Sequence, residues 1–69
     1  SDNTLSTQKE ALELHLVLRI MNSLGYIGDS AILSKYLSSS FDPNKTEMLL
    51  KDRQSIIAHI NKALSESQL

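Results

Sequence analysis

The chain contains no cysteine and no tryptophan, and its 69 residues include one proline, two glycines and three aromatic residues. Without cysteine it can form neither a disulfide bond nor a metal site built on thiolates. Below about 70–80 residues a single apolar core rarely supplies more than 3–5 kcal/mol, and oligomerisation is a common source of further stability. The composition therefore favours one small domain that associates.

Clustered charge is also lacking. Seven Lys and Arg residues stand against eight Asp and Glu residues, for a net charge of −1, and the basic residues are spread singly along the chain. Nucleic-acid-binding domains gather basic residues into patches, so nucleic acid is disfavoured as a partner. No apolar run approaches the roughly 20 residues of a membrane-spanning helix, and no signal-peptide pattern opens the chain. We therefore expect no membrane partner and an intracellular location, in the nucleus or the cytoplasm.

Few residues could carry chemistry, and they lack the spacing that chemistry needs. His15 and His59 have no second histidine or carboxylate at a metal-ligand spacing. The serines at 38–40 and 65–67 lack the glycine-rich elbow of a nucleophile, and the Gly25–Gly28 turn follows no strand, so it is not a phosphate loop. We expect no enzymatic activity, no metal and no cofactor, and we expect both histidines at the surface or at an interface.

Capping residues predict where the first and the last helix begin and end. Thr7 and Glu10 have the spacing of a capping box, which predicts a helix from about 8 to 24. Gly25 accepts the left-handed backbone that ends such a helix. Asp42-Pro43 suits the start of another helix, predicted to run to about residue 65 without interruption.

Between these helices, Asp29 is the predicted N-cap of a short second helix, residues 30–38, which forms a tight hairpin with the first. No strand is predicted. The expected fold is all-α, a helical hairpin plus a longer third helix, assembled as a symmetric oligomeric bundle. We expect a disordered or linker segment at 1–6, a single helical oligomerisation domain at 7–65 and a frayed C-terminus at 66–69.

Apolar side chains occupy two opposite faces of the first predicted helix. At about 100° per residue, one broad arc, the expected core face, holds Ala11, Leu14, Val17, Leu18, Met21 and Leu24. Leu12, Leu16 and Ile20 lie on the other side at intervals of four residues, so they stack along the helix. A helix that is apolar on opposite sides is buried on both sides. The chain's own short second helix hardly covers this stripe, so we expect a second copy to cover it, with a sandwich by the chain's own helices as the alternative.

The third predicted helix carries two apolar rows that each repeat every seven residues. The rows are Leu50, Ile57 and Leu64, and Leu49, Ile56 and Ala63, with Ile60 between them. Arg53 stands where a continuous heptad seam needs an apolar residue. The stripe therefore fits either the core or a coiled-coil-like seam.

Residues 16–37 resemble the LisH motif, a dimerising helical hairpin. The residue pairs that correspond to the motif here are Leu16-Val17, Ile20-Met21, Gly25-Tyr26 and Ser30-Ala31. Ile20 replaces an aromatic residue of the motif, one additional residue precedes Ser30, and the acidic residue after the second helix is absent. The resemblance implies a dimer of paired hairpins, extended by a longer helix such as 43–65.

Leu24–Gly28 is also similar to the turn of helix-hairpin-helix DNA-binding modules, where a Gly-Ile-Gly turn offers backbone N–H groups to a phosphate. Tyr26 stands where that turn has its first glycine, and only Lys35 adds positive charge nearby. Phosphate binding with so little charge would be weak and salt-sensitive.

The sequence as a whole predicts a homodimerisation or homotetramerisation module of a larger intracellular scaffold or regulatory protein, whose linked copies gain multivalency. The expected oligomer interface consists of Leu12, Leu16, Ile20, Leu50, Ile57 and Leu64. Two alternatives are a monomeric docking domain that receives an amphipathic helix of another protein and the DNA-binding hairpin.

Overall fold

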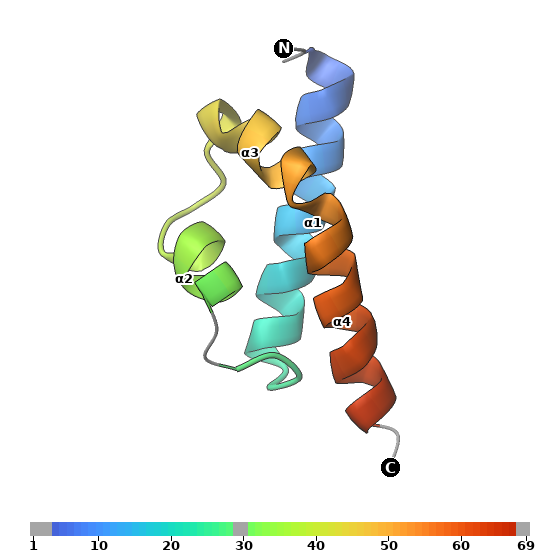
Figure 1. Cartoon of the computed structure of the whole chain (residues 1–69). Helices are drawn as coiled ribbons and strands as arrows, with labels where there is room; N and C mark the ends of the chain where they lie inside the picture. Colours follow the sequence, from blue (N-terminus) through green and yellow to red (C-terminus); the bar gives the residue numbers. More distant parts are fainter. Residues whose placement is uncertain (1–3, 29–30, 68–69) are drawn as a thin grey trace.

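The computed structural model describes residues 4–28 and 31–67, and this part of the chain is helical, without strands. Its helices are α1 (Leu5–Ser23), α2 (Ala31–Leu37), α3 (Thr46–Lys51) and α4 (Arg53–Ser67), and the 3-10 turn η1 (Pro43–Lys45) precedes α3. α3 packs against α1, α4 runs alongside α1 in the same direction, and α2 lies on the other side of α1 from α4 (Figure 1). The all-α prediction is confirmed.

α1 begins earlier than the capping box predicts. Thr4 is the N-cap, and its Oγ1 accepts a hydrogen bond from the backbone N–H of Thr7 at 3.3 Å. Thr7 lies inside the first turn, where its own Oγ1 donates to the Thr4 carbonyl at 2.9 Å. The prediction that Thr7 caps the helix is wrong, because Thr4 offers the same hydroxyl three residues earlier and the helix gains a turn.

The end of α1 follows the predicted chemistry. Gly25 has a φ of 82°, and its N–H donates to the Asn22 carbonyl at 3.0 Å. The Tyr26 N–H donates to the Met21 carbonyl at 2.9 Å, which completes a Schellman motif. Glycine adopts this left-handed backbone without the strain that a Cβ brings, so the prediction for Gly25 is confirmed. The next prediction along the chain, the N-cap at Asp29, lies outside the described residues.

The third predicted helix is interrupted. Asp42 caps the 3-10 turn, and its Oδ1 accepts from the Asn44 N–H at 3.0 Å, so the predicted start at Asp42-Pro43 is confirmed. At Asp52, however, the backbone leaves helical geometry at φ −89° and ψ 7°, and the chain bends between α3 and α4. The bend in Figure 1 allows α3 and α4 to pack on different parts of α1, and the uninterrupted helix 43–65 is wrong.

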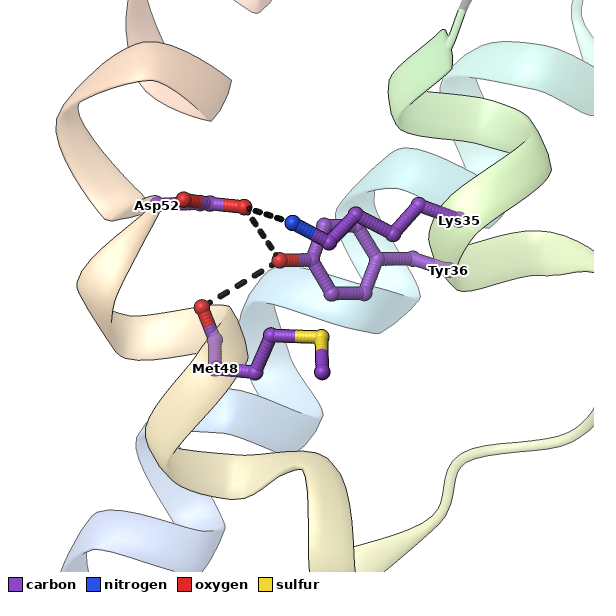
Figure 2. Close-up of polar contacts among 4 residues, drawn as sticks. All are labelled: Lys35, Tyr36, Met48 and Asp52. Carbon is purple, nitrogen blue, oxygen red and sulfur yellow. Dashed lines mark hydrogen bonds and ion pairs between the residues drawn. The ribbon is translucent and has the colours of Figure 1, made fainter.

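A small polar cluster holds this bend (Figure 2). The Tyr36 hydroxyl lies 2.5 Å from Asp52 Oδ2 and 3.2 Å from the Met48 carbonyl, and Lys35 Nζ lies 2.9 Å from the same carboxylate oxygen. The hydrogen bond from Tyr36 and then that from Lys35 lower the pKa of Asp52. Burial and Asp52 raise the pKa of Tyr36. The cluster ties α2 to the junction of α3 and α4.

The apolar core lies where α1 meets the other helices. α1 contributes Ala11, Leu18 and Met21, the turn after it contributes Ile27, and the remaining buried apolar side chains are Leu33, Tyr36, Leu49, Ile56 and Ile60. Leu14, Phe41 and Leu50 pack partly buried against this cluster. The core therefore covers only one side of α1.

Candidate interaction surface

The second apolar face of α1 is exposed, because α2, α3 and α4 all pack elsewhere on that helix. Leu12, Leu16 and Ile20 are 46, 51 and 48% exposed. The chain's own helices do not sandwich α1, so the alternative in which they cover this face is wrong.

Two residues expected in the core belong to the exposed face instead. Val17 is 41% and Leu24 is 66% exposed. The buried arc of α1 is rotated toward α2, because His15 takes a core position between α1 and α2. The exposed face, called the apolar stripe below, consists of Leu12, Leu16, Val17, Ile20 and Leu24.

His15 is buried, 5% exposed, which contradicts its expected place at the surface or an interface. Its Nε2 lies 2.8 Å from the carbonyl oxygen of Tyr36 in α2, and because a carbonyl only accepts, Nε2 carries the hydrogen. The edge of the Phe41 ring packs against the imidazole at a centroid distance of 5.7 Å. The contacts of His15 come from residues more than 20 positions away, so nothing in the local sequence indicated them. His59 is half-buried on α4.

The two seven-residue rows of the predicted third helix have different environments. Leu49 and Ile56 are buried, whereas Ile57 and Leu64 are each 38% exposed and Leu50 is half-buried. The row with Leu49 and Ile56 faces the core, and the row with Leu50, Ile57 and Leu64 faces outward.

A shallow groove joins this outward row to the apolar stripe. Leu14 and Val17 of α1 line it together with Leu50 and Ile57, and its charged rim consists of Glu10, Glu13 and Arg53. Of the six residues expected at an interface, Leu50 and Ile57 line this groove, and Leu50 is the least accessible of the six.

The C-terminal part of α1 is nearly free of charge. Between residues 14 and 28, Arg19 is the only Lys, Arg, Asp or Glu. The Arg19 guanidinium donates to the Ser39 carbonyl through Nη2 at 2.8 Å, so this charge is held against the chain's own loop. Depletion of charge with apolar enrichment is typical of the centre of protein–protein interfaces.

A second apolar depression lies at the opposite end of α1. Leu5, Ser6, Gln8, Lys9 and Leu12 line it from α1, and Phe41 lines it from the loop before η1. We call it the N-terminal hollow. Sequence reasoning missed it, because Phe41 reaches it from a distant segment.

The accessible surface is large for a chain of this size. It measures 4771 Å², whereas a compact monomer of 7.7 kDa exposes about 4,300 Å². The radius of gyration is 12.1 Å, against about 11 Å for a compact domain of this length. Elongation along α1 and α4 accounts for the difference, since the molecule extends over 40 × 20 × 17 Å.

The described part of the chain was also compared with the geometry of a metal site, a membrane-spanning helix and a phosphate-binding turn. No group of three histidine, aspartate or glutamate side chains there could hold a metal ion. None of the helices within residues 4–28 and 31–67 has the length and apolar character to cross a membrane. The N–H groups of Gly25, Tyr26 and Ile27 already donate to carbonyls at the end of α1, so they are not open to a phosphate.

The residues of the LisH-like pattern differ in their exposure and in their position in the fold. Leu16 and Ile20 are exposed on the apolar stripe, Met21 is buried, and Gly25 ends α1.

Comparison with protein-family models, with curated proteins and with solved structures finds no match to this chain.

Proposed function

We propose that this protein is a homo-oligomerisation module in which a second copy covers the apolar stripe of α1. The observation that carries the proposal is the stripe itself, five large apolar side chains that are 41–66% exposed on one helix. Monomeric proteins rarely expose apolar patches of more than a few hundred Å², and larger ones mark interaction sites. The LisH-like pattern of residues 16–37 points in the same direction.

Burial of the apolar stripe contributes favourably to the free energy of association. Complete burial of one Leu or Ile side chain contributes about 1.5–3 kcal/mol, so a half-exposed side chain gains on the order of 1 kcal/mol when it is covered. In a two-fold dimer both copies contribute the same stripe, and the gain is doubled.

The charge pattern favours a second copy as the partner. A strongly charged surface would repel an identical surface and select a partner of opposite sign. The charged side chains beside the apolar stripe instead carry both signs, with Lys9 beside Leu12 in the N-terminal hollow and Glu10, Glu13 and Arg53 beside Val17 in the groove. Two copies can therefore meet without two surfaces of a single charge sign facing each other. The function of such a module is multivalency, since linked copies raise the effective concentration of whatever is attached to them.

Light-scattering mass measured over a range of concentrations tests the proposal. The wild-type chain is expected to run as a dimer or tetramer at tens of micromolar. Leu16→Asp and Ile20→Asp place a charge in the stripe and are expected to give monomers that keep their helical circular dichroism. Ser55→Asp is the matched control, because it adds the same charge at an exposed position of α4, and it is expected to keep the wild-type mass.

A monomeric wild-type chain at these concentrations, or an unchanged mass in the double variant, would overturn the proposal. A monomer that binds an added amphipathic helical peptide through the stripe would instead identify a docking domain for another protein.

A further inference from the structure

We infer that the dimer has its two-fold axis parallel to α1 and α4, so that α1 of each copy lies on α4 of the other and Glu13 pairs with Arg53 across the contact. This inference rests on the proposed self-association and adds the orientation and the charged contact. Its basis is a face of two helices on which charged and apolar side chains follow the same order along both.

α1 and α4 together form a face that is broader than the apolar stripe. At about 100° per residue, Glu13, Val17, Ile20 and Leu24 lie within about 60° of one another around α1, and Leu16 lies at the edge of this arc with Leu12 beyond it. Around α4, Arg53, Ile57 and Leu64 lie within about 40° of one another. Both sets contribute to the groove between the helices, so they lie on the same side of the molecule.

The same order of side chains occurs at the same levels of the two helices. Glu13, Val17 and Leu24 each stand 40 positions before Arg53, Ile57 and Leu64. The groove brings the first two of these pairs together, and the helices run side by side in the same direction (Figure 1). Because both helices rise about 1.5 Å per residue, the third pair also lies at one level. The face is therefore charged at one end and apolar toward the other.

The charges at this end have no ion-pair partner in the described part of the chain. The ion pair found there joins Lys35 to Asp52, and neither Glu13 nor Arg53 takes part in it. Arg53 is the first residue of α4, where the helix dipole disfavours a positive charge, and it interrupts an apolar seam. A polar residue within such a seam fixes the register and orientation of the partner.

The positions of the charges separate the possible pairings. An axis parallel to the helices keeps each level and places α1 on α4, so Glu13 meets Arg53 and Leu24 meets Leu64. An axis perpendicular to the helices turns one copy end over end, so the charged end covers Leu24 and Leu64 and loses water without gaining a partner. A parallel pairing of α1 with α1 sets Glu13 against Glu13, which is unfavourable. The first arrangement alone matches both the charges and the apolar side chains.

Disulfide cross-linking tests the placement of α1 on α4, because the chain has no native cysteine to interfere. A disulfide needs Cα atoms within about 7 Å. A mixture of Leu24→Cys and Leu64→Cys is expected to give a covalent dimer under mild oxidation. Either variant alone is the control and is expected to give at most a minor covalent product. Identical helices lie on the diagonals of this four-helix bundle, with axes about 11–14 Å apart when neighbouring axes are 8–10 Å apart.

Charge reversal gives a second readout. Glu13→Arg alone and Arg53→Glu alone each set like charges against each other at two places in the dimer. Each is expected to raise the dimer Kd about 3–30-fold at low salt, with unchanged helical circular dichroism. Both changes in one chain restore the pair in reverse order and are expected to return the Kd to within about threefold of the wild type.

Glu66→Arg is the control for the change of charge. Glu66 is exposed and lies about 180° from Ile57 around α4, away from the proposed contact. The variant is expected to keep the Kd within about threefold of the wild type. A Kd raised as much as by Glu13→Arg would mean that net charge, rather than the pair, sets the effect, and would overturn the arrangement.

The outcomes separate this inference from the proposed function. A wild-type chain that is monomeric by mass overturns both. A chain that is dimeric by mass, but in which the mixed cysteine variants give no more covalent dimer than either alone, keeps the proposed function and overturns this arrangement. A double charge reversal that stays as weak as the single ones does the same.

Discussion

The Tyr36 hydroxyl links two segments that are far apart in the chain. Its single O–H donates to the Asp52 carboxylate and lies 3.2 Å from the Met48 carbonyl, while the Tyr36 backbone carbonyl accepts from His15. Hydrogen bonds to charged acceptors contribute more than neutral ones, and solvent screening reduces this gain where the acceptor is exposed. One residue of α2 thus contacts both α1 and the bend before α4.

Removing that hydroxyl is expected to destabilise the fold without changing the apolar packing. Tyr36→Phe should lower the free energy of unfolding by about 1–3 kcal/mol, measured by urea denaturation at a fixed protein concentration. Tyr26→Phe is the matched control, because Tyr26 is 44% exposed and its hydroxyl takes no part in this cluster, and a change within about 0.5 kcal/mol is expected there. Equal losses in the two variants would mean that the cluster contributes nothing measurable.

The same cluster makes stability depend on pH at the acid end. The hydrogen bond from Tyr36, followed by that from Lys35, lowers the pKa of Asp52 below its usual range. A carboxylate with a lowered pKa in the folded state stabilises the protein above its unfolded pKa of about 3.9 and loses that contribution as the pH falls through the folded value. Stability should therefore fall below about pH 4.

The melting temperature measured between pH 6 and pH 2.5 checks this expectation. Asp52→Asn should flatten the acid limb of the curve, since the variant has no carboxylate to protonate at this position. Glu47→Gln, at an exposed position of α3, should leave the limb as in the wild type. An acid limb that is the same in all three chains would remove Asp52 as its cause.

Two helix boundaries that depend on one residue's own chemistry were predictable, whereas the hydroxyl cap of α1 was predicted at Thr7 and lies at Thr4. Gly25 ends α1 because of its backbone freedom, and Asp42-Pro43 starts η1 through a side-chain acceptor and a fixed φ. The bend at Asp52 was not predictable, because the groups that hold it, Lys35 and Tyr36, come from α2. Local pattern does not show which distant group will reach a given carboxylate.

Contacts with a distant segment also explain why Val17 and Leu24 of α1 were wrongly assigned to the core. Periodicity correctly identified Leu12, Leu16 and Ile20 as a face separate from the core. It placed Val17 and Leu24 on the core side, because the centre of the core arc depends on where α2 packs. That position is set by the burial of His15, which has no sequence signature.

The turn after α1 offers a matched pair of glycine substitutions. A Cβ at either Gly25 or Gly28 meets no atom within 4 Å, but only Gly25, among the described glycines, has a positive φ, 82°. Gly25→Ala is therefore expected to lower the free energy of unfolding by roughly 1–2 kcal/mol through backbone strain. Gly28→Ala should be neutral or slightly stabilising. Equal effects, measured by thermal or urea denaturation, would contradict this explanation.

At the scale of the molecule, a small core and a large exposed apolar face would link folding to the proposed association. If a second copy covers the stripe, only the folded chain binds it, so the melting temperature should rise with protein concentration. Thermal unfolding across a hundredfold range of concentration is expected to show this rise in the wild type. Leu16→Asp, which removes the contact, should melt at the same lower temperature throughout the range.

The shortness of α2 has a consequence for the order in which parts of the molecule open. A helix of seven residues is not stable by itself in water, so α2 depends on its contacts with His15 and Asp52. We therefore expect α2 to open as a separate unit, with its amide hydrogens exchanging with solvent through a local event rather than through global unfolding. The amides of α2 should exchange faster than those at the centre of α1, and the stripe on the far side of α1 stays formed while α2 opens and closes.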